Sequence, residues 1–102
     1  MTKYVYLISD LNNYTYKIGI SENPEKRIKT LQTGNDKTLK IIHKVLCENY
    51  NDVETALHNQ YNFLRVNGEW FELGEEDVRN FPQSCKKMDE NFKIIKTFKL
   101  YL

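Results

Sequence analysis

Two short runs of β-branched and aromatic residues near the start of the chain constrain the fold most. They cover residues 3–9 and 15–20 and flank a segment of turn formers, Asp10-Leu-Asn-Asn13. Such a pattern predicts a β-hairpin. If the turn has two residues, even positions of the first strand lie opposite odd positions of the second. Tyr6 and Lys17 then project from the same face. Polar and aromatic side chains inside two core strands indicate a functional surface.

Helix and strand signals alternate along the chain after this hairpin. Asn23 is a predicted helix N-cap, and Gly34 marks the predicted end of that first helix. A third strand is predicted over residues 38–47, and a second helix over residues 52–64, where apolar residues recur at helical spacing. A short strand is predicted over residues 69–73. The order β-β-α-β-α-β predicts an α+β fold, a small antiparallel sheet of three to four strands flanked by helices.

The length of 102 residues fits one domain. We expect residues 1–74 to form it and residues 75–102 to form a C-terminal extension packed on the same domain. This extension is predicted to begin with a short helix that ends before Pro82, because proline disfavours a helical residue before it. The polar residues 83–91 are predicted to be a loop. The tail, residues 92–102, fits a strand slightly better than a helix.

Composition excludes several classes of protein. The net charge of +1 argues against binding nucleic acid through a strong basic field alone. Cys47 and Cys85 lack CxxC spacing, so free thiols are expected rather than a zinc site or a disulfide. No apolar run is long enough to span a membrane, and no signal-peptide pattern is visible. We therefore expect a soluble intracellular protein, in the cytoplasm of a host or producing cell, with no membrane partner.

Several spaced residues resemble the GIY-YIG nuclease superfamily over about residues 3–73. Tyr4-Val-Tyr6 stands where the family has Gly-Ile-Tyr, and Lys17-Ile-Gly19 stands where it has Tyr-Ile-Gly. Arg27 matches the family's arginine, and Glu54 matches its metal-binding glutamate. With Leu57-His58 and Gly68-Glu-Trp-Phe71 added, the pattern is similar to a phage and viral subfamily often labelled DNA-binding.

This chain departs from the family pattern at two positions. Tyr4 replaces the first glycine, and Lys17 replaces the tyrosine of the second motif. Tyr16 is adjacent to Lys17, but strand alternation directs it to the opposite face, so it cannot substitute for that tyrosine.

The resemblance implies a metal-dependent endonuclease that hydrolyses phosphodiester bonds in DNA. Tyr6 would be the general base, Arg27 would contact the scissile phosphate, and Glu54 would hold one Mg²⁺ or Mn²⁺ ion. A free phenol has a pKa of about 10 and is a poor base near neutral pH. A nearby ammonium group such as Lys17, together with a metal ion, would favour the phenolate.

Further residues have candidate roles around this site. His58, one turn after Glu54, would orient that glutamate or pack beside it. His43 on the third strand is either a proton shuttle or phosphate contact, or an ordinary packing residue. Lys26 joins Arg27 and Lys17 as candidate nucleic-acid contacts. Glu69 is a cap or ion-pair partner, with a second role near the metal as the alternative.

Two other classes of function are kept beside the nuclease. Each site residue has an ordinary structural interpretation, such as core packing for Tyr6 or a surface ion pair for Arg27. A catalytically inactive nucleic-acid-binding module with the same fold is therefore the alternative hypothesis. A protein-interaction module is a third class without positive support. We expect a monomer or a homodimer.

Overall fold

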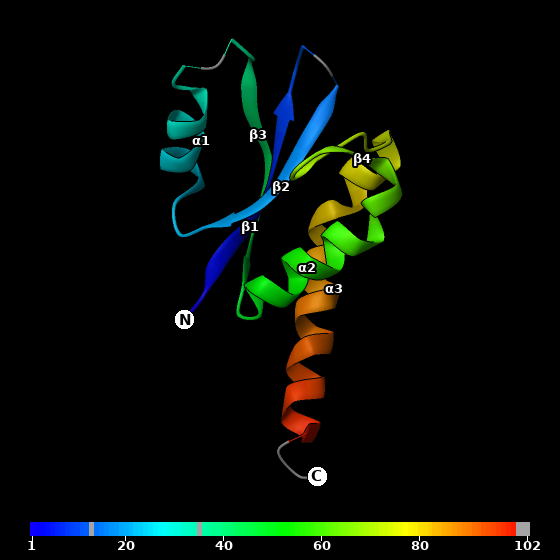
Figure 1. Ribbon diagram of the computed structural model, residues 1–102. Helices are drawn as coiled ribbons and strands as arrows, with labels where there is room; N and C mark the ends of the chain where they lie inside the picture. Colours follow the sequence, from blue (N-terminus) through cyan, green and yellow to red (C-terminus); the bar gives the residue numbers. More distant parts are fainter. Residues whose placement is uncertain (13, 35, 100–102) are drawn as a thin grey trace.

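Antiparallel strands form one sheet with helices on both faces in the computed structural model, which describes residues 1–12, 14–34 and 36–99 (Figure 1). The order across the sheet is β3-β1-β2-β5-β4. The strands are β1 (Lys3–Asp10), β2 (Thr15–Ser21), β3 (Leu39–Cys47), β4 (Arg65–Asn67) and β5 (Trp70–Phe71). The helices are α1 (Pro24–Gln32), α2 (Tyr50–Gln60), the 3-10 turn Asn62–Leu64 and α3 (Glu75–Lys99). The predicted α+β class is confirmed, and the sheet formed by the described residues has five strands in place of the expected three to four.

The register of the first hairpin places Tyr6 and Lys17 on the same face, as predicted. Tyr6 lies opposite Gly19, and Ile8 lies opposite Lys17. The connection between the two strands, residues 11–14, is longer than the two-residue turn assumed, but it also has an even number of residues, so the same positions face each other. Asn13 of the predicted turn lies outside the described residues. A Cβ atom at Gly19 would overlap the Tyr6 ring, so only glycine fits beside this tyrosine.

The two faces of the sheet have different roles. Figure 1 shows α1 on one side of the sheet and α2 with α3 on the other. The side of α2 and α3 carries the main hydrophobic core, which is made of alternate strand residues and the inner faces of both helices. Its fully buried members include Val5, Leu7, Ile18, Leu57 and Phe81. The other residues of β1 point to the opposite face of the sheet, the face of α1. Tyr6 is one of them and is buried there.

Helix α1 begins and ends where its sequence predicts. The Asn23 side chain accepts a hydrogen bond from the Lys26 backbone N–H at 3.1 Å, as an N-cap does. Gly34, just past the helix, has a φ of 70°, a conformation that favours glycine. This start places Arg27 one turn into the helix, beside the end of β2.

Helix α3 contradicts three predictions for the C-terminal segment. It runs without interruption from Glu75 to Lys99, through Pro82 and through the predicted loop 83–91. The described part of the tail is therefore helix rather than strand, and residues 100–102 of that prediction lie outside the described residues. Phe81 and Cys85 in its first half belong to the hydrophobic core.

Contacts with β3 compensate for the proline inside α3. Pro82 has no N–H, so it cannot bond the carbonyl of Val78, four residues earlier. His43 Nε2 lies 2.9 Å from that oxygen and donates the missing hydrogen bond. The imidazole also stacks on the Phe81 ring at 5.9 Å between centroids. A contact distant in sequence thus supplies a hydrogen bond that the proline removes from the helix.

The structure bears on two expectations drawn from composition, the state of the two cysteines and the presence of a membrane-spanning helix. Cys47 and Cys85 are free thiols, both buried against the core. Burial raises the pKa of Cys47 to about 11. Among the described residues, no helix combines the length and the apolar character that crossing a membrane requires.

Candidate active site at the edge of β2

The outer edge of β2 is only partly covered by another strand. Strand β5 pairs with Tyr16 and Lys17 and ends there. The next residue, Ile18, donates its N–H to the Glu69 carbonyl at 3.1 Å and accepts a hydrogen bond from His58 Nε2 at 2.9 Å. Beyond this point no described strand pairs with the outer edge of β2. Side chains from both faces of the sheet can therefore meet around it.

Tyr6 and Arg27 meet on the α1 side of this edge. Tyr6 is 1% exposed, and Arg27 donates a hydrogen bond to its hydroxyl. Burial raises the pKa of Tyr6, and the negative charges of Glu69 and Glu54 add to the rise. The hydrogen bond and charge of Arg27 oppose it without reversing it. Tyr6 is consequently a neutral phenol near neutral pH.

Lys17 interacts with Glu69 rather than with Tyr6. Its Nζ lies 2.5 Å from Glu69 Oε1, and only 9% of the lysine side chain is exposed. The expectation that Lys17 lowers the pKa of Tyr6 is not supported, because the cation that acts on this phenol is Arg27. Tyr16 packs with the core on the opposite face, as strand alternation predicts.

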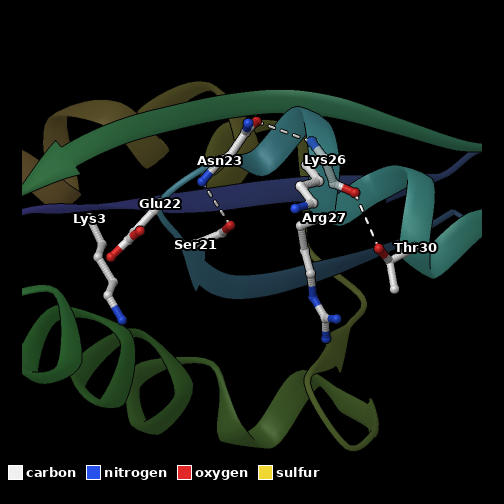
Figure 2. Close-up of a pocket in the computed structure, with 7 residues that line it drawn as sticks. All are labelled: Lys3, Ser21, Glu22, Asn23, Lys26, Arg27 and Thr30. Atoms are coloured by element: carbon white, nitrogen blue, oxygen red, sulfur yellow. Dashed lines mark hydrogen bonds between the residues drawn. The ribbon is translucent and has the colours of Figure 1, made fainter.

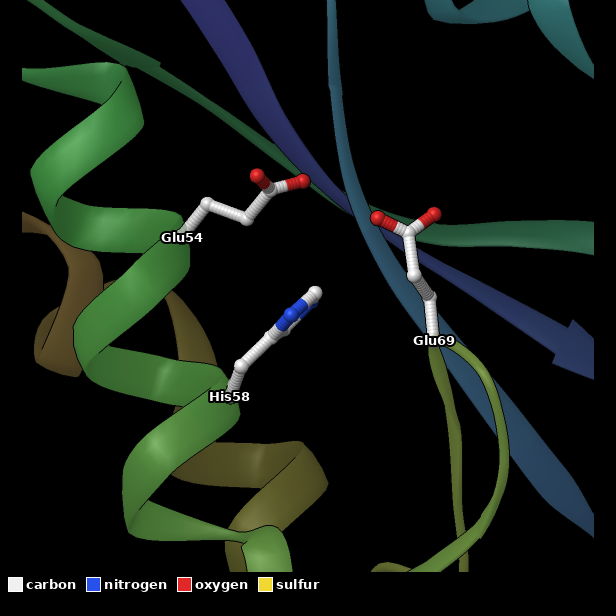
Figure 3. Close-up of side chains that lie close together, drawn as sticks. All are labelled: Glu54, His58 and Glu69. Atoms are coloured by element: carbon white, nitrogen blue, oxygen red, sulfur yellow. The ribbon is translucent and has the colours of Figure 1, made fainter.

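Glu54, His58 and Glu69 form a cluster, shown in Figure 3, that we call the acidic cluster. One potential ligand atom of each lies within 4.8 Å of the others. Glu54 and His58 are one turn apart on α2, and Glu69 lies in the loop between β4 and β5. Burial raises the pKa of Glu54, and the Glu69 carboxylate raises it further, whereas His58 and Lys17 lower it.

The chemistry of the acidic cluster fits one divalent cation. Two carboxylates suit Mg²⁺ or Mn²⁺, and an imidazole favours transition metals. His58 Nε2 donates to a backbone carbonyl, which leaves Nδ1 as the nitrogen with a lone pair for a metal. The like charges of Glu54 and Glu69 disfavour each other, and a cation between them would relieve this repulsion.

A groove at the start of α1, which we call the basic groove, is lined in part by Arg27 (Figure 2). Its volume is about 530 Å³. Three of its residues are cationic, and one is acidic. It is lined by Lys3, Ser21, Glu22, Asn23, Lys26, Arg27 and Thr30. Arg27 belongs both to this basic groove and to the contacts of Tyr6, so the groove leads directly to the candidate site.

The structure brings together most of the residues selected from the sequence. Tyr6, Lys17, Arg27, Glu54 and His58 surround the edge of β2, and Lys26 lines the basic groove.

His43 does not join this group. It pairs with Leu7, whose side chain belongs to the core on the α2 and α3 side, and it contacts α3 through Val78 and Phe81. In this geometry His43 packs against α3 on the opposite face of the sheet from Tyr6, as the packing interpretation expects, and its contacts give no support to a role as a proton shuttle or phosphate contact.

Two residues of the site were not selected from the sequence. For Glu69, a place near the metal is only the alternative interpretation of the sequence, although this residue lies between Gly68 and Trp70, directly before β5. The sequence gives no signal for Lys3, because a lysine at the first position of a strand is ordinary. It lies opposite Cys47 on β3 and lines the basic groove.

Comparisons with known proteins give one match. A family model described as the T5orf172 domain matches residues 3–86. The matched segment extends from β1 into the first half of α3 and contains every residue of the acidic cluster and the basic groove. Neither the curated proteins nor the solved structures contain a match.

Proposed function

This chain belongs to the T5orf172 domain family, and from this premise we propose that it is a metal-dependent endonuclease of the GIY-YIG type that hydrolyses phosphodiester bonds in DNA. One observation supports the proposal above the others. Tyr6, Arg27 and Glu54 come from three different elements, and their side chains interact at the open edge of β2. Structural packing alone does not require a tyrosine, an arginine and two carboxylates at one point.

Each side chain has a defined part in this proposal. Arg27 binds the scissile phosphate through its planar set of donors. Glu54 holds one Mg²⁺ or Mn²⁺ ion, with His58 and Glu69 as further ligands. When bound, the ion neutralises charge on the phosphate and assists the leaving oxygen.

Tyr6 acts as the general base in the proposed reaction. Its hydroxyl is held by Arg27 and is screened from solvent, so its position is fixed before the substrate arrives. Its raised pKa means that the phenolate is scarce near neutral pH. The proposed activity should therefore increase in alkaline solution.

The basic groove is the proposed path of the DNA strand next to the scissile phosphate. Lys3 and Lys26 line it together with Arg27. Contacts between lysines and phosphates position a nucleic acid without reading its sequence. Recognition of the backbone alone predicts limited sequence specificity.

A catalytically inactive DNA-binding module is the second candidate, and two observations favour it. The phenol of Tyr6 is neutral, and the carboxylate of Glu69 is paired with Lys17. Both groups are thus held in forms that do not perform the chemistry. The basic groove would serve such a module equally well.

Cleavage assays separate the two candidates. Plasmid, single-stranded and branched DNA are incubated with the protein and Mg²⁺, Mn²⁺ or EDTA, and size-exclusion chromatography reports whether it is a monomer or a homodimer. The nuclease proposal expects metal-dependent cleavage that Glu54→Gln and Tyr6→Phe abolish, with the exposed Glu76→Gln on α3 as the matched control. Cleavage that persists in both site variants contradicts the assigned residues. DNA binding without cleavage under either metal supports the inactive module.

A further inference from the structure

Lys17 places a charged ammonium group inside the protein, directly beside the acidic cluster. Its Nζ lies 2.5 Å from Glu69 Oε1, and its side chain is 9% exposed. The same ammonium acts on Glu54, because it lowers the pKa of that carboxyl. One positive charge therefore serves both carboxylates of the cluster.

A divalent ion in the acidic cluster would compete with this ammonium. Glu69 contributes a ligand atom to the cluster, and the same carboxylate accepts the hydrogen bond of Lys17. Two positive charges a few ångströms apart repel each other, and water screens them less in a partly buried site. The ammonium thus already supplies part of the charge neutralisation that a metal would otherwise bring.

We propose that Lys17 is a built-in counter-ion of the acidic cluster, which competes with the metal ion for Glu69 and keeps metal affinity low. This inference rests on the proposed function, because it requires the cluster to hold a divalent ion. Without a metal, Lys17 pairs the charge of Glu69 and so stabilises the loop that closes the edge of β2.

A simpler structural role makes the opposite prediction. If Lys17 only holds Glu69 in the position that a metal requires, its removal loosens Glu69 and weakens metal binding. If Lys17 competes with the metal, its removal strengthens binding through Glu69. The direction of the change in affinity therefore decides between the two roles.

The affinity of the full chain for Mn²⁺ can be measured by titration with Mn²⁺ alone, in which electron paramagnetic resonance reports the concentration of the free ion. The competing role expects Lys17→Met to bind Mn²⁺ about tenfold more tightly, because a nearby positive charge is removed. The double variant Lys17→Met with Glu69→Gln should lose this gain. Lys44→Met is the matched control, since Lys44 forms a 2.5 Å ion pair with Glu25 outside the acidic cluster.

Each outcome decides the proposal. Unchanged or weaker Mn²⁺ binding by Lys17→Met overturns it, as does a gain that persists after Glu69→Gln. If neither the wild type nor any variant binds Mn²⁺, the metal site of the proposed function fails as well. If the wild type binds Mn²⁺ and Glu54→Gln does not, the metal site stands and only the role of Lys17 is in question. Thermal unfolding confirms that each variant is folded, and Lys17→Gln replaces Lys17→Met if that variant does not fold.

Discussion

The hydrogen bond from His43 to α3 gives a quantitative prediction about the stability of the fold. Pro82 leaves the Val78 carbonyl without its partner inside the helix, and His43 Nε2 supplies the replacement at 2.9 Å. The substitution His43→Phe keeps an aromatic ring against Phe81 and removes only the donor. A carbonyl left without a partner costs about 1–3 kcal/mol, and this partly buried position favours the lower half of that range.

Pro82→Ala changes the cost of losing His43. Alanine restores an N–H at position 82, which can bond the Val78 carbonyl within the helix. In that background, His43→Phe no longer leaves the carbonyl without a partner, and its cost should fall below about 0.5 kcal/mol. The two substitutions are therefore expected to couple by about 1 kcal/mol.

Urea unfolding of the wild type, both single variants and the double variant measures this coupling as a thermodynamic cycle. The free energies are comparable only if the slope against urea concentration is the same for all four proteins. Additive effects within about 0.5 kcal/mol would show that the histidine does not replace the bond that the proline removes. The continuity of α3 through Pro82 would then need another cause.

The remaining predictions concern the site itself. Gly19→Ala should destabilise the fold by about 1–3 kcal/mol in thermal or urea unfolding, because the new Cβ overlaps the buried Tyr6 ring; an unchanged stability would contradict the close approach. If Tyr6 is the base, its raised pKa predicts a cleavage rate that rises about tenfold per pH unit between about pH 7 and 9, and a falling rate excludes this role. Lys26→Ala and Lys3→Ala should each reduce by about 1 the slope of log affinity for an oligonucleotide against log salt, measured in EDTA. Lys29 lies on α1 like Lys26 but does not line the groove, so Lys29→Ala should leave that slope unchanged.

Local patterns predicted those elements whose causes lie within a few residues. The hairpin register follows from strand alternation, and the start of α1 follows from the Asn23 cap. Strand β4 escaped prediction, because its three residues are all exposed and show no alternation. The C-terminal helix escaped for a different reason, since the bond that replaces the one lost at Pro82 comes from His43, which is 39 residues before Pro82 in the sequence. No local rule can contain that contact.

The sequence predicted which residues of the candidate site lie together where they share one face of a hairpin or of a helix. Tyr6 and Lys17 share a face by parity, and Glu54 and His58 share a helix face by spacing. The partner of Lys17 was not predictable in this way. It depends on where the two-residue strand β5 begins, because that point brings Glu69 beside β2. The role of Lys17 therefore changed from a neighbour of Tyr6 to the partner of Glu69.

The open edge of β2 links the stability of the fold to its proposed chemistry. An uncovered strand edge leaves backbone groups without partners, which is unfavourable. Here both backbone groups of Ile18 have partners, because its N–H donates to the carbonyl of Glu69 and its carbonyl accepts from the ring of His58. The residues that complete the edge are thus two of the three members of the acidic cluster. In the proposed metal site, the Nε2 bond of His58 would leave Nδ1 as the nitrogen available to the ion, whereas the Glu69 carboxylate would have to exchange Lys17 for it. If the acidic cluster holds a metal ion as proposed, the pair between Lys17 and Glu69 is therefore the contact at this edge with which the ion must compete.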